Sequence, residues 1–300
     1  MNSISASTYR RTDLAAESSP AGGAAGVRHD EYERSGIPVS VMKVEAGEGE
    51  RSAGRPAGTY VTVTASKPWL WDDVRRDSLT SLLAELISDA VLSVTGTRPC
   101  PDFPVLVCGL GNRAMTADAI GPKVADAVTV TSQLSLERPE LYDALGCCRV
   151  SSTAPGVAAA TGIEAVDVVR GIADTVHPAV IILVDALAAR SCSRLASTIQ
   201  IADTGISPGS GIGNRRRAIT KETVGVPVVT VGVPTIVDSS TLVYDALELG
   251  GIDLTEHSDE LRAVLENGRS FFVTPKESDV VTEEMARLIA DSIDLLCHTC

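Results

Sequence analysis

Aromatic residues make up only 3% of this 300-residue chain, although hydrophobic residues make up 44%. The core must therefore consist mostly of Val, Ile, Leu and Ala side chains. This composition suits parallel strands that are covered by helices on both faces. Acidic residues outnumber basic ones, which gives a formal net charge of -13 and an isoelectric point of about 4.8. This charge disfavours nucleic acid as a direct partner and is compatible with a basic protein substrate.

Histidine is scarce as well, since the chain has four, and none lies at the glycine-rich ends of the predicted strands. The chain has no H-E-x-x-H and no G-x-S-x-G motif, so a zinc peptidase or a serine hydrolase would lack its usual residues. The seven cysteines are odd in number and irregularly spaced, which argues against a disulfide framework. Cys297 and Cys300 form a single C-x-x-C pair, so a metal or redox site there is a minor alternative. We expect no metal and no other cofactor.

Long apolar runs are also missing. The chain begins with polar residues rather than an apolar signal region, and runs such as 179–184 are far too short to span a membrane. We therefore expect a cytoplasmic protein without membrane contact.

Two stretches each combine a short apolar strand with an aspartate. In the first, a predicted strand at Val105–Cys108 leads into a glycine turn at Gly109–Asn112, and Asp118 opens the helix that follows. In the second, a predicted strand at Ala179–Val184 runs directly into Asp185. Residues just past the carboxyl ends of parallel strands line the ligand crevice of an α/β sheet. We therefore expect both aspartates on one rim of one sheet.

The order of elements favours one α/β domain. Residues 1–35 are polar and predict a flexible N-terminal segment, whereas residues 36–300 are predicted to form a single domain. Strands alternate with helices, which is typical of βαβ units. The predicted fold is a mainly parallel central sheet with helices on both faces and a small N-terminal β extension. Predicted strands cover 37–44, 60–64, 105–108, 179–184, 198–201 and 226–233; predicted helices fall within 69–94 (capped by Asp77 or Ser78), 162–176, 239–249 and 282–296, and 45–58 is a predicted loop.

Carboxylates are the only acid–base groups that gather at the predicted strand ends. Two neighbouring carboxylates can hydrolyse an amide, because their mutual repulsion keeps one of them protonated near neutral pH. One then activates water and the other polarises the carbonyl. As structural alternatives, Asp118 would be a helix cap and Asp185 the ion-pair partner of Arg190. The strand-end carboxylates are Asp118, Asp185, Asp203 and Asp238.

Three other motifs give weaker signals. Asp203-Thr-Gly205 matches the triplet of pepsin-like proteases, but those are all-β and carry two triplets, so we interpret Asp203 as a loop-organising residue close to the site. Gly209–Gly213 lacks the G-x-G-x-x-G spacing of a dinucleotide site. Arg215–Arg217 would bind phosphate or form a solvated basic loop, which leaves a non-catalytic nucleotide- or phosphate-binding protein as an alternative.

A dense series of short motifs resembles the spore germination protease family. The motifs occur in order between residue 11 and about residue 245 and are therefore far more specific than any single triplet. They include Arg11–Ala15, Ser35–Val39, Arg55–Tyr60, Gly109–Asn112, Thr116–Pro122, Ala154–Val157, Asp185–Arg190, Thr198–Gly205, Pro208–Asn214 and Gly232–Asp238.

The resemblance implies an atypical aspartic endopeptidase that degrades small acid-soluble spore proteins during germination, in the spore interior. Asp118 and Asp185 match the two proposed catalytic aspartates of the family. The family is made as a zymogen, loses a short N-terminal segment by self-cleavage and assembles as a homotetramer. Its fold is similar to that of hydrogenase-maturation peptidases, which bind metal, so a metal-dependent peptidase is a further alternative.

Other residues take supporting roles in this interpretation. Backbone N–H groups at Gly109, Gly111 and Asn112 are expected to stabilise the oxyanion, because glycines let a backbone approach closely. Arg190 and Asp203 are expected to support the site.

The N-terminal segment carries one more expectation, because its residues 12–17 read Thr-Asp-Leu-Ala-Ala-Glu. This sequence is similar to the cleavage sequence in the family's substrates, so we expect self-cleavage between Asp13 and Leu14. The chain departs from the family pattern at Arg113 and Ala114, and it has Ala117 where a proline is expected. These departures concern cleavage preference more than the reaction.

Overall fold

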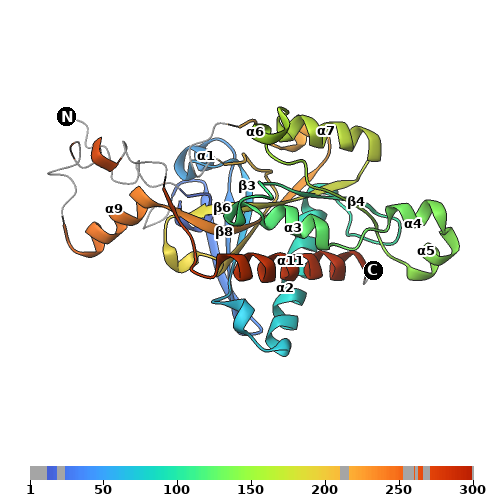
Figure 1. Cartoon of the computed structure of the whole chain (residues 1–300), viewed down its shortest axis with the longest axis horizontal. Coiled ribbons are helices and arrows are strands. Elements are labelled where there is room, and N and C mark those ends of the chain that lie inside the picture. The colour runs from blue at the N-terminus through green and yellow to red at the C-terminus, as the bar shows by residue number, and fades with distance from the viewer. Residues whose placement is uncertain are drawn as a thin grey trace.

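A mixed β-sheet runs through the computed structural model of the chain (Figure 1). The described residues are 12–18, 24–209, 216–252, 260, 263–265 and 271–298. Within them the sheet has nine strands. The strands are β1 (Val27–Arg34), β2 (Ile37–Val44), β3 (Gly58–Thr64), β4 (Pro104–Gly109), β5 (Arg149–Thr153), β6 (Val180–Ala189), β7 (Thr198–Ala202), β8 (Val228–Asp238) and β9 (Phe272–Val273).

The strand order is β1-β2-β3-β7-β8-β6-β4-β5, and β9 pairs with β8. The four strands β5, β4, β6 and β8 run parallel to one another. The N-terminal strands β1, β2 and β3 extend the sheet in antiparallel pairs and join it through β7, which is antiparallel to β8. The predicted α/β class, with a parallel centre and an N-terminal β extension, is therefore confirmed.

Helices cover both faces of the parallel strands (Figure 1). The pleat explains why, since successive side chains of a strand point to opposite faces. In β4, Val105 and Val107 belong to the cluster that includes α2, α3 and α11, whereas Leu106 and Cys108 pack against α7 and α8. The helices are α1 (Glu48–Ala53), α2 (Asp73–Thr95), α3 (Ile120–Ala127), α4 (Ser132–Glu137), α5 (Pro139–Leu145), α6 (Ala158–Thr161), α7 (Ala165–Val176), α8 (Lys221–Val224), α9 (Ser239–Leu249) and α11 (Ser278–His298).

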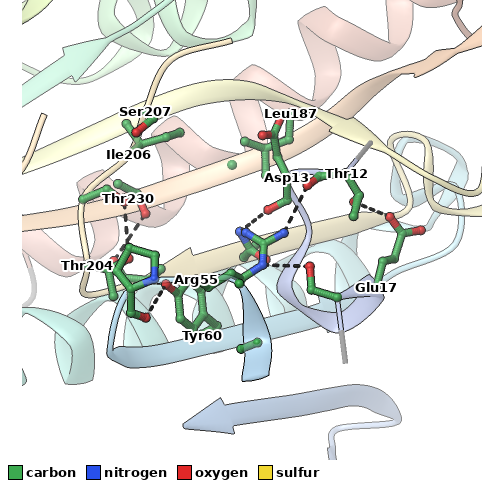
Figure 2. Close-up of a pocket in the computed structure, with 18 of the residues that line it drawn as sticks. Thr12, Asp13, Glu17, Arg55, Tyr60, Leu187, Thr204, Ile206, Ser207 and Thr230 are labelled. Atoms are coloured by element: carbon green, nitrogen blue, oxygen red, sulfur yellow. Dashed lines mark hydrogen bonds between the residues drawn. The ribbon is translucent and has the colours of Figure 1, made fainter. Parts of the chain in front are cut away.

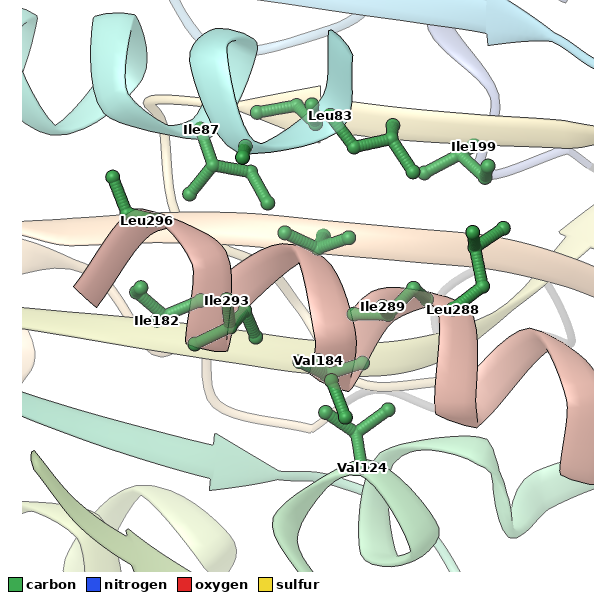
Figure 3. Packing of buried hydrophobic residues seen from close by; sticks show 14 of the residues in the cluster. Leu83, Ile87, Val124, Ile182, Val184, Ile199, Leu288, Ile289, Ile293 and Leu296 are labelled. Carbon is green, nitrogen blue, oxygen red and sulfur yellow. The ribbon is translucent and has the colours of Figure 1, made fainter. Parts of the chain in front are cut away.

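The larger core lies between the sheet and the pair of helices α2 and α11 (Figure 3). It consists almost wholly of aliphatic side chains, as the low aromatic content requires. Each such side chain contributes about 1.5–3 kcal/mol when it is fully buried. Side chains that contact one another in this layer include Leu83, Ile87, Ile182, Val184, Ile289 and Ile293.

Helix α2 begins earlier than predicted. Its N-cap is Asp72, whose carboxylate accepts the Arg75 N–H at 2.9 Å, so the predicted cap at Asp77 or Ser78 is wrong. By length and composition α2 could also cross a membrane. Its apolar face, however, packs in the core through Leu79, Leu83 and Ile87.

Part of the predicted flexible segment 1–35 is ordered. Residues 27–34 form β1, and residues 12–18 lie against the sheet. The pattern could not be read from the sequence because seven of the eight residues of β1 are exposed, which leaves no apolar alternation. The predicted loop 45–58 likewise contains α1.

Candidate active site

The turn after β4 is built for close backbone contact. Strand β4 ends at Gly109, which is paired with Val184 of β6, and the Leu110 N–H donates to the Val184 carbonyl oxygen at 2.8 Å. Gly111 then adopts a φ of +115°, and a Cβ there would meet the carbonyl oxygen of Asp118. Glycine is therefore required at 111 for the turn to lie directly against Asp118.

Asp118 is the last residue of a short 3-10 helix (Thr116–Asp118) that precedes α3. Its Oδ2 accepts the Asn112 N–H at 2.7 Å. Burial raises the pKa of the Asp118 carboxyl, and the Asn112 N–H opposes this rise by stabilising the ionised form. The turn therefore binds one oxygen of the Asp118 carboxylate.

Asp185 lies within β6 and not past its end, contrary to the sequence prediction. It nevertheless faces a crevice, because β4 stops opposite Val184 and leaves the next position of β6 without a partner on that side. On the other side Asp185 is paired with Gly232 of β8. The long apolar run that follows Asp185 continues the strand, which is why its end was predicted too early.

Asp185 is almost fully buried, with 5% of its surface exposed. Its Oδ1 accepts the Ala186 N–H at 2.9 Å. Burial raises the pKa of Asp185 well above the usual range, and the nearby carboxylates of Asp118 and Asp13 raise it further. Mutual repulsion of this kind favours a protonated Asp185 beside an ionised neighbour.

The two predicted aspartates line one cavity of about 280 Å³. Asp13, from the N-terminal segment, lines the same cavity, together with Gly111 and Asn112 of the turn. The structure therefore brings Asp118 and Asp185 together from two separate elements. No group of three or more His, Cys, Asp or Glu side chains is placed to hold a metal among the described residues.

The predicted oxyanion turn is largely occupied. The Leu110 N–H is bound to Val184 and the Asn112 N–H to Asp118. Within the described part of the chain, the Gly111 N–H has no acceptor. This corrects the expectation that the whole turn from Gly109 to Asn112 serves as donor, because holding Asp118 uses the Asn112 N–H.

Arg190 and Asp203 do not line the cavity that contains the aspartate pair. The Arg190 guanidinium is 3.1 Å from Asp245, so the alternative in which Arg190 pairs with Asp185 is wrong. Asp203 accepts the Thr59 N–H at 2.7 Å and organises the start of β3. This contact agrees with a loop-organising residue, and Asp203 is not among the residues that line the cavity of Asp118 and Asp185.

The basic and cysteine motifs also have structural partners. Arg216 and Arg217 line the rim of the cavity and form ion pairs with Glu164 and Asp167. Cys297 is a buried residue of α11, and its carbonyl oxygen accepts the Cys148 N–H at 2.8 Å. The other members of these motifs, Arg215 and Cys300, lie outside the described residues, as do Gly211 and Gly213.

A docked N-terminal segment is the feature that the sequence did not predict. Residues 12–17 lie on the sheet beside a second cavity of about 700 Å³, and Asp13 lines both cavities (Figure 2). The Asp13 N–H donates to the Ala188 carbonyl oxygen at 2.8 Å, and the Ala188 N–H donates to the Asp13 carboxylate at 2.9 Å. Leu14 is fully buried among side chains that include Leu187 and Leu195.

The polar partners of this segment were missed too. Gln200 contacts it from β7, and Arg55 donates to the Thr12 carbonyl oxygen at 3.2 Å (Figure 2). The available signal was Gln200 itself, a long polar residue between two isoleucines of the strand Thr198–Ala202. Its contacts span 185 positions of sequence, so no local pattern identifies them.

Comparisons with known proteins show the family of this chain. A family model described as germination protease matches residues 6–257. The germination protease of Caldanaerobacter subterraneus subsp. tengcongensis is 37% identical over 291 residues, which cover 90% of this chain and 87% of the relative. That of Clostridium acetobutylicum is 36% identical over 321 residues, which cover 98% and 95%. Among solved structures, the [NiFe] hydrogenase maturation protease HycI from Thermococcus kodakarensis is similar with a TM-score of 0.34 and 17% identity, over 69% of this chain and 98% of that chain.

The match to the family model and the two curated relatives define this α/β protein as a peptidase. More particularly, the chain belongs to the germination protease family. The resemblance inferred from the motifs is therefore confirmed.

Proposed function

We propose that this chain is a spore germination endopeptidase of atypical aspartic type, which degrades small acid-soluble spore proteins in the spore interior. The observation that carries the proposal is the pairing of Asp118 and Asp185 in one cavity, with Asp13 of the docked segment beside them. The acidic chain, with a net charge of -13, also favours a basic substrate.

The two aspartates differ in a way that supports separate roles. Asp185 is the more deeply buried, and its pKa is raised by burial and by the two neighbouring carboxylates. Asp118 accepts a backbone N–H that favours its ionised form. We therefore assign Asp118 as the general base and protonated Asp185 as the acid.

In the proposed reaction Asp118 takes a proton from water, and the resulting hydroxide attacks the carbonyl carbon of the scissile peptide. The proton of Asp185 is shared with the carbonyl oxygen as negative charge develops there. When the C–N bond breaks, protonated Asp118 gives its proton to the leaving amine, and the carboxyl product retains the hydroxyl oxygen. Both aspartates end in their starting states.

The same arrangement supports the proposed self-processing at Asp13–Leu14. Asp13 lines the cavity that contains the pair, and the buried Leu14 side chain fixes the position of the bond between them. Intact-mass analysis of aged protein under mildly acidic, dehydrating conditions tests this. A chain that stays full length would contradict self-processing.

Incubation with a purified small acid-soluble spore protein, followed by mass mapping of the fragments, tests the endopeptidase. We expect a few discrete cuts, and the same cuts in the presence of a metal chelator. Loss of cleavage on chelation would favour the metal-dependent alternative instead. The family resemblance also leads us to propose a homotetramer, which sedimentation analysis of the purified chain tests.

A further inference from the structure

The docked segment places the carboxylate of a glutamate in a buried pocket of hydrogen-bond donors. Both carboxylate oxygens of Glu17 are bound by consecutive backbone N–H groups, from Arg190 at 2.7 Å and from Ser191 at 3.1 Å. The Thr12 hydroxyl donates to the same carboxylate at 2.5 Å, and the Arg194 guanidinium lies 3.4 Å from it. Only 6% of the Glu17 side chain is exposed. Four donors for one buried carboxylate indicate recognition rather than a chance surface contact.

Gln200 binds the backbone on both sides of Leu14. Its side-chain oxygen accepts the Ala15 N–H at 2.6 Å, and its side-chain nitrogen donates to the carbonyl oxygen of Asp13 at 3.2 Å. The Asp13 carbonyl is the one that self-processing would attack. Gln200 therefore already donates to the oxygen on which negative charge would develop.

The sheet explains how Gln200 and Asp185 serve one peptide. Gln200 of β7 is paired with Gly232 of β8, and Gly232 is paired with Asp185 of β6. Residues paired across neighbouring strands point to the same face, so the two side chains lie on one face with a glycine between them. The Leu187 side chain packs directly over Gly232, where an added Cβ would collide with it.

We propose that the residues that hold Thr12–Glu17 form the substrate-binding track of the peptidase. In this track Gln200 is a catalytic residue that binds the scissile carbonyl oxygen. The Arg190–Arg194 turn is a subsite for a glutamate four residues after the residue that carries this carbonyl. The inference rests on the proposed function, because it takes Thr12–Glu17 as a substrate held in its own site.

The test uses the full chain and its rate of processing at Asp13–Leu14, measured by intact mass. Gln200→Leu removes the donor to the carbonyl oxygen at similar size, and we expect processing to slow about 100-fold or more, as for other oxyanion donors. Glu17→Gln leaves one backbone N–H unpaired and removes the charge, and we expect a slowing of about tenfold or more. Arg98→Ala, which removes an exposed guanidinium paired with Asp89, is the control and should process at the unaltered rate.

A double-mutant cycle separates recognition from general damage. If Arg194 acts through the glutamate, Arg194→Ala should slow the unaltered chain but have little further effect on Glu17→Gln. Additive effects of the two changes would contradict a shared subsite.

Hydrogen exchange of the Ala15 amide, measured in the same proteins, reports docking without catalysis. Faster exchange together with slower processing in Glu17→Gln supports the subsite. Faster exchange with an unchanged processing rate overturns it, because the turn would then hold the segment without serving the reaction. If the unaltered chain is never processed, the proposed self-cleavage fails and the substrate role of the track fails with it, whereas the exchange data still show whether Glu17 anchors the segment.

Discussion

Replacing Gly111 by alanine tests whether the turn after β4 places Asp118. Gly111 has a φ of +115°. An added Cβ would collide with the carbonyl oxygen of Asp118 and lie 3.0 Å from the Asp118 side-chain Oδ1. The unfavourable φ costs about 1–3 kcal/mol by itself. The collision adds to this, because a backbone oxygen cannot move without shifting the 3-10 helix that carries Asp118. We therefore expect a loss of about 3 kcal/mol or more.

Gly146 provides a matched control, because it also has a positive φ, of +59°, but nothing lies within 4 Å of an added Cβ. Gly146→Ala should cost only about 1–2 kcal/mol. Thermal unfolding followed by circular dichroism separates the two variants, at roughly 2–4 °C for each kcal/mol. Gly111→Ala should also lose about 100-fold in peptidase activity per folded molecule, since misplacing a reacting group by about 1 Å has this effect. Equal stability losses in both variants, with full activity in Gly111→Ala, would refute the reasoning.

Three further predictions concern single side chains. Because the folded state raises the pKa of Asp185, it binds that proton more tightly than the unfolded chain, so this group lowers stability as pH rises from about 4. Asp185→Asn should therefore unfold at a higher temperature than the unaltered chain at pH 7, and the gain in unfolding temperature should be smaller at pH 4. A larger gain at pH 4 than at pH 7 would contradict a raised pKa of Asp185 in the folded state. Asp203→Ala loses the bond to the Thr59 N–H, and we expect about 1–3 kcal/mol less stability but unchanged activity per folded molecule, so a large loss of activity would return Asp203 to the site. Leu14→Ala removes a fully buried side chain, which should weaken docking of the segment by about 2–5 kcal/mol and speed hydrogen exchange at Ala15, whereas unchanged exchange would show that Leu14 does not anchor it.

Much of the sheet could be predicted because its strands are apolar and short. The strands at Ile37–Val44 and Pro104–Gly109 were located within a residue or two. Asp118 and Asp185 line one cavity, although Asp185 lies within β6. Periodicity also identified α11, whose buried residues recur at helical spacing. These features depend on local sequence, so local sequence reveals them.

The remainder depends on contacts between distant parts of the chain. The first turn of α2 was missed because it is mostly charged, and its one apolar residue, Val74, faces solvent. Helix α1 is short and lies between Gly47 and Gly54, and it is held partly by Glu50, whose carboxylate accepts the Gly47 N–H. Docking of the N-terminal segment requires the β6 edge at Ala188, which lies 175 positions away. The sequence suggested that Asp13–Leu14 is a cleavage site, but it gave no sign of where this bond would lie.

The central claim is that two carboxylates perform the reaction together, and their isosteric amides test it most directly. Cleavage of a purified small acid-soluble spore protein should be compared for the unaltered chain, Asp118→Asn, Asp185→Asn and the surface control Asp89→Asn, each at matched amounts of folded protein. We predict that Asp89→Asn cleaves at the unaltered rate while either site variant loses essentially all cleavage and keeps its fold. Undiminished cleavage by Asp118→Asn or Asp185→Asn would contradict the account.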